Sequence, residues 1–296
     1  MLERLNWARD GARWPHREAS QFVEAGGVRW HVQRFGQAHA VDRTVVLLHG
    51  TGAATHSWRV LAPLLARRFK VVAMDLPGHG FTSMPDTGRM SLPGMSAAVA
   101  DLLDALGERP VLAVGHSAGA AIAARMVLDR RIDPRAIVSI NGALLPLPGL
   151  AGRVYAPMAR LLALNPLVPR LFAWRAAEKR VLLRLIEGTG SKIDAQGIAL
   201  YGQLVGSPGH AAAALAMMAA WDLNRLAADL PAMQTQLWLL AGERDRTVSP
   251  EQAQTLAARM PNAHLCVLPE LGHLAHEEQP GTVLAAMEPA LVASTT

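Results

Sequence analysis

Short apolar runs recur along the chain and alternate with helical patterns, and this alternation constrains the fold most. The runs have the length and the bounding residues of buried strands and lie at 44–48, 71–74, 111–114, 136–140, 237–240 and 265–268. Segments with apolar residues three or four apart lie between most of them, at 56–68, 91–106, 118–128 and 250–260, and one more at 280–292 ends the pattern. This order predicts an α/β fold with a mainly parallel central sheet and helices on both faces.

The pattern changes at two places. Residues 21–34 alternate loosely around Gly26 and Gly27, which predicts an antiparallel hairpin at the sheet edge. About ninety residues separate the strand that ends near Leu144 from the next one, far more than a crossover needs. We therefore expect an inserted helical cap at 146–230, a core formed by 21–145 and 231–296, and an N-terminal extension at 1–20 without an assigned place.

Composition excludes several classes of protein. The chain has 296 residues, of which 51% are hydrophobic and 18% charged, as in a folded globular protein. The net charge is +5, but outside one segment the basic residues are scattered and lack interleaved aromatic side chains on a regular face, so no nucleic-acid partner is expected. No apolar run has the length of a signal peptide or a membrane span, which predicts a cytoplasmic protein. We expect no cofactor and no metal, because the His273/His276 pair lacks a third ligand and no glycine-rich phosphate loop precedes a helix.

The segment 153–187 concentrates the positive charge. It holds seven basic residues and two acidic ones, interspersed with Leu, Phe and Trp. Two interpretations are open. This part of the cap touches an anionic membrane surface weakly, which would make the protein peripheral to the membrane, or it closes the pocket and leaves its arginines in water.

A candidate nucleophile follows the strand at 111–114. Gly115-His116-Ser117-Ala118-Gly119 fits the pattern Gly-x-Ser-x-Gly, in which a strand turns sharply into a helix and exposes the serine hydroxyl. The flanking glycines leave room for the tight turn, and the serine is expected to adopt a strained backbone conformation.

A serine nucleophile needs a histidine base and an acid that orients it, each on a loop after a later strand. Asp245 follows the strand at 237–240, and His273 follows the strand at 265–268. The alternatives are Glu243 as the acid and His276 as the base, with His276 otherwise a supporting residue near the site. For the oxyanion hole, we expect the backbone N–H groups of Ala118, at the start of a helix, and of Thr51, in the loop His49-Gly50-Thr51-Gly52.

Together these motifs resemble the α/β-hydrolase superfamily. "HGTG", "DLPGHGFTS", "GHSAG", "GERDRTV" and "LGHLAHEEQP" occur in that family's order, from about residue 20 to the end. The resemblance implies the α/β-hydrolase fold. A serine at position 117, in place of aspartate, favours acyl chemistry on esters or related C–C chemistry over dehalogenation or epoxide opening.

A narrower resemblance covers nearly the whole chain. "RWPHREAS", "FVEAGGVRWHVQRFG", "NGALLP" and "NPLVPRLFAW" are similar to the magnesium chelatase accessory proteins of bacteriochlorophyll biosynthesis. This implies a link to tetrapyrrole metabolism without supplying a reaction. Two functions stay open: a serine hydrolase that cleaves an ester-type bond of a small apolar substrate such as a tetrapyrrole, or a non-catalytic accessory protein that binds a porphyrin-like ligand for magnesium chelatase or a neighbouring pathway enzyme.

Overall fold

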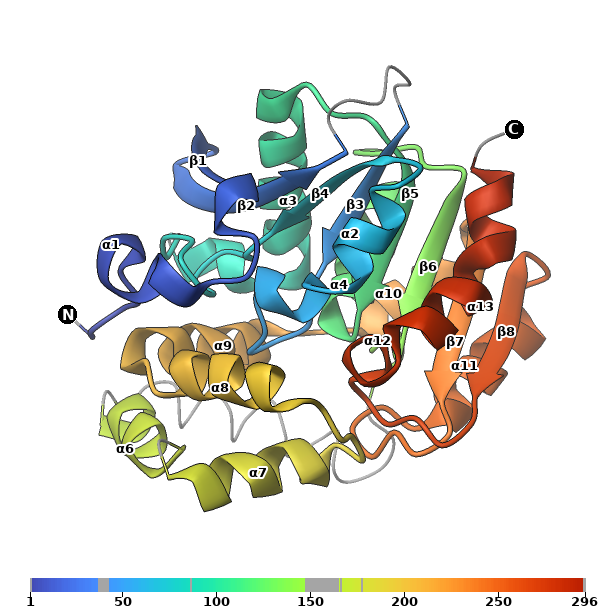
Figure 1. Cartoon of the computed structure of the whole chain (residues 1–296). Helices are drawn as coiled ribbons and strands as arrows, with labels where there is room; N and C mark the ends of the chain where they lie inside the picture. Colours follow the sequence, from blue (N-terminus) through green and yellow to red (C-terminus); the bar gives the residue numbers. More distant parts are fainter. Residues whose placement is uncertain are drawn as a thin grey trace.

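A computed structural model of the chain describes residues 2–36, 43–85, 87–146, 165, 167–176 and 178–294. Its centre is an eight-stranded sheet in the order β1-β2-β4-β3-β5-β6-β7-β8 (Figure 1). The strands are β1 (Ser20–Ala25), β2 (Val28–Phe35), β3 (Thr44–Leu48), β4 (Lys70–Met74), β5 (Pro110–His116), β6 (Ala136–Ile140), β7 (Gln236–Gly242) and β8 (Ala263–Leu268). All neighbours from β4 to β8 are parallel, which confirms the predicted α/β-hydrolase fold.

Each buried strand contributes to two cores, one on each face of the sheet. Val46 and Leu48 of β3 pack in one hydrophobic cluster, whereas Val45 and Leu47 pack in the other. The first cluster includes residues of α3 (Leu92–Leu106), α4 (Ala118–Leu128) and α11 (Pro250–Arg259). The second includes residues of α2 (Leu61–Leu65) and α13 (Pro280–Ala293), so helices cover both faces.

The predicted hairpin forms the edge of the sheet. β1 pairs with β2 in antiparallel register, and β2 is antiparallel to β4. Gly26 and Gly27, with φ of 56° and 73°, make the two-residue turn.

The helix predicted at 56–68 is wrong in its extent. The chain instead forms a short 3₁₀ turn, η3 (Thr55–Trp58), and then α2. Pro63 has no N–H for the carbonyl of Arg59, and that carbonyl lies 2.6 Å from Nε2 of His16 in the N-terminal segment. A continuous helix is thus interrupted by a proline and by a tertiary contact that periodicity does not reveal.

Most of the described residues between β6 and β7 are helical. They form α6 (Leu167–Ala176), α7 (Lys179–Gly188), α8 (Ala195–Val205), α9 (Pro208–Ala220), α10 (Asn224–Asp229) and the 3₁₀ turn η5 (Leu230–Ala232). In Figure 1, α6 to α9 lie together below the sheet. The cap predicted at 146–230 lies partly outside the described residues, and the division of the chain into extension, core and cap stays a prediction.

The N-terminal residues connect this helical region to the sheet. They form α1 (Trp7–Asp10) and the 3₁₀ turns η1 (Gly11–Arg13) and η2 (Arg17–Ala19), and the buried indole of Trp14 donates to Thr55 Oγ1 at 3.0 Å. The remaining elements are η4 (Thr87–Met90) and α12 (Ala275–Glu278). Among the described residues, no helix is long and apolar enough to cross a membrane.

Candidate active site

Ser117 lies on the tight turn between β5 and α4. Its φ of 51° and ψ of −117° are strained for a residue with a side chain, and its N–H donates to the carbonyl of Ile140 at 3.1 Å. A Cβ atom added to Gly115 would lie 2.3 Å from the backbone nitrogen of Ala120, and one added to Gly119 would lie 2.0 Å from the carbonyl oxygen of Leu48. Only glycine fits at both flanks, as the motif predicts.

Asp245 and His273 meet at the carboxyl ends of β7 and β8. Nδ1–H of His273 donates to Oδ2 of Asp245 at 2.7 Å, and both side chains are buried. The other carboxylate oxygen, Oδ1, accepts from the N–H groups of Thr247 at 2.7 Å and Val248 at 2.9 Å. The carboxylate is therefore fixed, and it determines which imidazole nitrogen carries the proton.

The alternative acid has a different place. Glu243 is exposed, and its carboxylate accepts from the backbone N–H of Glu270 at 3.1 Å. The geometry favours Asp245 as the partner of His273.

Ser117 and His273 line one large cavity. Its volume is about 1110 Å³, and its walls come from the loops after β3, β5, β7 and β8 and from the helices α7, α8 and α9. Met218, Trp221 and Leu182 are among its apolar residues, while Met217 is buried in the core and Trp174 lies at the surface. The described lining residues include one acid, Asp222, and neither Lys nor Arg.

The two expected oxyanion donors also line this cavity. Ala118 is the first residue of α4, and Thr51 lies in the loop after β3. Within the described part of the chain, neither backbone N–H has a protein acceptor. Both groups are thus available to a ligand in the cavity.

Two residues that the sequence analysis did not single out hold the loop of His273. Nε2–H of His116 donates to the carbonyl of His273 at 2.9 Å. Asn141, in a left-handed conformation after β6, donates to the carbonyls of Gly272 and His273 at 2.9 and 2.8 Å and accepts from the N–H of Gly242 at 2.7 Å. The Asn-Gly pair directly after a buried strand was the available signal for Asn141.

His276 supports the site by packing. Its ring lies 4.5 Å from that of His116 and 4.6 Å from that of Trp58, measured between centroids. Neither of its nitrogens has a hydrogen-bond partner among the described residues. Burial lowers the pKa of His276 to about 3 and that of His116 well below its ordinary value, so both rings are neutral at pH 7.

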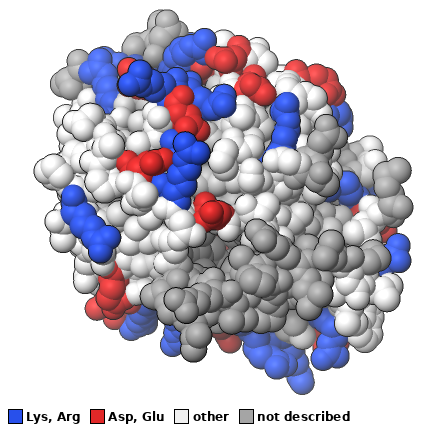
Figure 2. All heavy atoms as spheres, turned by 180° about the vertical axis from the view of Figure 1, so that it is seen from behind, with Lys and Arg blue, Asp and Glu red and all other residues white. Residues whose placement is uncertain are grey.

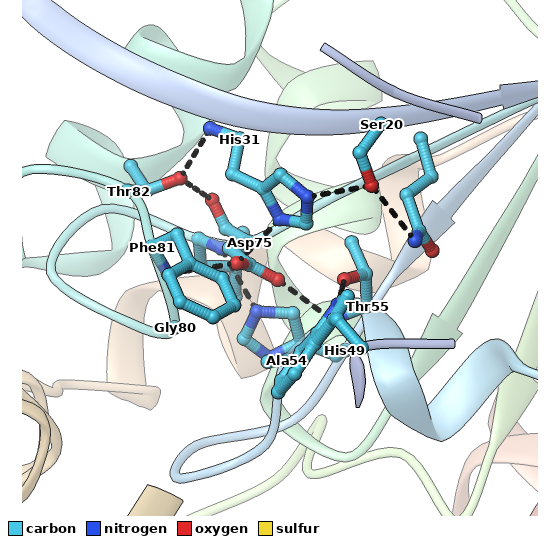
Figure 3. A network of polar contacts seen from close by, with 12 residues as sticks. Ser20, His31, His49, Ala54, Thr55, Asp75, Gly80, Phe81 and Thr82 are labelled. Carbon is cyan, nitrogen blue, oxygen red and sulfur yellow. Dashed lines mark hydrogen bonds and ion pairs between the residues drawn. The ribbon is translucent and has the colours of Figure 1, made fainter. Parts of the chain in front are cut away.

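Figure 3 shows a hydrogen-bonded chain of Ser20, His31 and Asp75, none of which lines the cavity. Nδ1–H of His31 donates to Oδ2 of Asp75 at 2.8 Å, and Nε2 of His31 lies 3.0 Å from Oγ of Ser20. Burial alone raises the pKa of Asp75, but the contact with His31 outweighs it and holds that pKa well below its usual range. Asp75 also accepts from the N–H groups of Thr55 and Phe81, so these hydrogen bonds join β1, β2 and the loops after β3 and β4.

The family model for the alpha/beta hydrolase family matches residues 45–287, which include the whole of this site. The chain belongs to the alpha/beta hydrolase family. It is 25% identical to an alpha/beta hydrolase fold protein from Burkholderia ambifaria, with a TM-score of 0.74 over 97% of this chain and 99% of that one. An esterase from Thermogutta terrifontis is 22% identical, with a TM-score of 0.72 over 94% and 99% of the two chains, and this likeness shows the shared fold.

A curated relative supports the narrower resemblance. The chain is 38% identical to the Magnesium-chelatase 30 kDa subunit of Rhodobacter capsulatus, over 90% of this chain and 92% of that protein. The resemblance found in the sequence is thereby confirmed.

The described residues contain no group of three His, Cys, Asp or Glu side chains that could hold a metal ion. The expectation that the protein uses no cofactor stays a prediction.

Proposed function

We propose that the protein is a serine hydrolase in which Ser117, His273 and Asp245 form the catalytic triad. The observation that carries this proposal is the buried hydrogen bond from His273 to Asp245, on loops that bring His273 into the same cavity as Ser117. The strained backbone of Ser117 and the two unpaired N–H groups of Thr51 and Ala118 support it.

Each residue of the site has its own role in the proposed ester hydrolysis. Oγ of Ser117 attacks the ester carbonyl carbon, Nε2 of His273 takes the hydroxyl proton, and the oxyanion accepts hydrogen bonds from Thr51 and Ala118. The C–O bond to the alcohol then breaks, and His273 protonates that alcohol as it leaves. Water repeats the sequence on the acyl-enzyme, which releases the acid and restores the Ser117 hydroxyl.

The cavity favours a large, apolar and uncharged ester. About 1110 Å³ exceeds the usual size of a pocket for a drug-sized ligand. A free carboxylate bound there would meet no Lys or Arg among the described lining residues, only Asp222. Because the relative from R. capsulatus is named as a magnesium-chelatase subunit, we place the substrate among tetrapyrroles whose carboxyl group is esterified.

A second candidate function uses the cavity to bind a ligand and involves no ester hydrolysis. The name of the same relative favours an accessory protein that binds a porphyrin-like ligand for a pathway enzyme. Such a protein needs the apolar walls and does not need the hydroxyl of Ser117.

Hydrolysis of a p-nitrophenyl ester by the purified chain separates the two functions. The hydrolase predicts turnover that Ser117→Ala lowers by several orders of magnitude while thermal unfolding is unchanged. If the wild type shows no turnover, or if Ser117→Ala turns over at the wild-type rate, the hydrolase proposal fails.

We also propose that α6 and α7 make a weak contact with an anionic membrane surface, and their exposed side chains support this. Leu167, Leu171 and Trp174 recur on one face of α6 and are 63%, 60% and 65% exposed. The segment 167–188 also exposes the basic residues Arg170, Arg175, Lys179, Arg180 and Arg184, against the acidic residues Glu178 and Glu187. Figure 2 shows basic side chains along the lower edge of the molecule, where Figure 1 places α6 and α7. Arg153 and Arg160 of the basic segment lie outside the described residues.

A further inference from the structure

The loop that carries Thr51 is held by an imidazole on each side. Nδ1 of His49 lies 2.8 Å from the carbonyl oxygen of Gly50, and Nε2 of His210 lies 3.0 Å from that of Gly52. His49 directly follows β3, whereas His210 belongs to α9, more than 150 residues later in the chain. Both rings are buried.

Backbone donors fix the proton on each ring. The N–H of Leu76 donates to Nε2 of His49 at 2.8 Å, so the proton of His49 is on Nδ1 and points to Gly50. The N–H of Gly80 donates to Nδ1 of His210 at 3.0 Å, so the proton of His210 is on Nε2 and points to Gly52. Burial lowers the pKa of His210 to about 4, which keeps the ring neutral at pH 7.

These contacts determine where the Thr51 N–H points. The carbonyl of Gly50 and the N–H of Thr51 belong to one planar peptide unit and point in opposite directions. His49 and the N–H of Ala53, at 3.1 Å, both donate to that carbonyl and fix its direction. Gly52 has a φ of 78° and little steric restraint, so its carbonyl needs an anchor of its own if the loop is to keep one conformation.

The N-terminal segment holds α9 at the position from which His210 reaches the loop. The N–H of Gly209 donates to the carbonyl of Glu3 at 2.8 Å. The guanidinium of Arg4 donates to the carbonyls of Gly78, Thr82 and Gly209, at 2.6, 2.9 and 3.3 Å. The segment thus joins the first turn of α9 to the loop after β4, which also carries Gly80. It therefore holds both His210 and Gly80, whose N–H donates to His210.

We infer that His210 is a positioning residue for the oxyanion hole, which couples the placement of α9 to the direction of the Thr51 N–H. This inference rests on the proposed hydrolase function. His210 touches no reacting atom, and it acts by holding the carbonyl of Gly52 with its Nε2–H. A shift of α9 away from the sheet would release that carbonyl, so the oxyanion hole is complete only while α9 is in place.

Two substitutions separate the two contacts of His210. In His210→Asn, the amide oxygen can still accept from the N–H of Gly80, but nothing reaches Gly52. In His210→Gln, the longer amide can still donate to Gly52 and loses the acceptor at the position of Nδ1. The pair is matched in chemistry and differs in which hydrogen bond survives.

Hydrolysis of p-nitrophenyl acetate and inhibition by an alkyl boronic acid, which forms a tetrahedral adduct on serine, are measured for both variants. We expect His210→Asn to lower kcat by about 10- to 100-fold with little change in KM, less than the loss of a whole oxyanion donor. The inhibition constant of the boronic acid should rise by a similar factor, and His210→Gln should retain most of the activity. If His210 had a purely structural role, the fall of kcat and the rise of the boronic acid's inhibition constant would not be similar in size.

The inference is overturned if His210→Asn matches the wild type in both measurements, or if the two variants lose activity equally. An inactive wild type would instead overturn the hydrolase proposal. Should His210→Asn not fold, ¹⁵N NMR of the histidine side chains in the wild type still decides. The inference requires the neutral Nε2–H tautomer of His210 at pH 7, and an Nδ1–H tautomer would contradict it.

Discussion

At the scale of the residue, the direction of each hydrogen bond determines what an imidazole in this protein can do. His273 gives its Nδ1–H to Asp245, so Nε2 is the nitrogen that can take a proton from a nucleophile. His116 gives its Nε2–H to the backbone of His273 and therefore acts as a support. His276 makes no hydrogen bond to the described residues and fills space. The sequence motif "GHLAHEEQP" contains both His273 and His276 and does not distinguish these roles by itself.

Asp245→Asn tests the role of the acid. Oδ1 of the amide would keep the N–H groups of Thr247 and Val248, which places the amide NH₂ against Nδ1 of His273. His273 would then carry its proton on Nε2 and could not accept one from Ser117. We expect kcat for a p-nitrophenyl ester to fall by about 10⁴-fold with thermal stability nearly unchanged. Glu243→Gln is the matched control, and a comparable loss there would argue for the alternative acid.

His276 makes folding stability depend on pH. Its pKa is about 3 in the folded protein because of burial and about 6.5 in the unfolded chain. Unfolding therefore takes up a proton between these two values, and the contribution of His276 to stability is present above pH 6.5 and lost as the pH falls. At pH 4 the loss is about 3 kcal/mol.

His276→Phe keeps a ring against Trp58 and His116 and removes the titration. We expect the free energy of unfolding in urea to fall less between pH 7 and pH 4 than in the wild type. An equal fall of the unfolding free energy in the two proteins would contradict the pKa assigned to His276.

At the scale of the element, periodicity located the strands well and failed where tertiary contacts decide. The apolar runs match β3 to β8 within a few residues. Strands such as β3 and β6 are mostly apolar because both of their faces are buried, whereas β8 is an edge strand and only partly buried. The helix predicted at 56–68 is interrupted between Trp58 and Leu61, where the missing N–H of Pro63 leaves the Arg59 carbonyl to His16. That partner lies 43 positions away, and no local pattern could indicate it.

The exposed face of α6 is also an element-scale feature, and vesicle sedimentation tests it. Each Lys or Arg near an anionic surface contributes about 1 kcal/mol, which salt screens. We expect the wild type to sediment with vesicles that contain phosphatidylglycerol, to stay in the supernatant with phosphatidylcholine alone, and to be released at high salt.

A variant with Leu171→Ser and Trp174→Ser should lose most of this binding, because it removes the apolar contact and keeps the charge. Val60→Ser, which changes an exposed apolar residue on the core, is the control. Equal recovery in both supernatants would exclude the membrane surface as a partner.

At the scale of the whole molecule, the candidate triad and oxyanion donors could be chosen from the sequence, whereas the residues that hold them could not. Ser117, Asp245 and His273 each follow a predicted strand, and parallel strands bring their carboxyl ends to one edge of the sheet. His210 reaches the loop of Thr51 only because α9 and the N-terminal segment pack there. The contribution of such a residue depends on three-dimensional packing that no motif records.

Labelling with a fluorophosphonate probe at pH 7, followed by peptide mass spectrometry, shows whether Ser117 is an activated nucleophile. An activated serine displaces fluoride from the phosphorus, which leaves one phosphonyl group on its oxygen. We expect one modification per chain, on Ser117, and none in a folded Ser117→Ala variant. Labelling of His273→Ala should be much slower, since the base is lost. A folded wild-type protein that stays unlabelled, or one labelled at another residue such as Ser20, would contradict the role of Ser117 as the nucleophile.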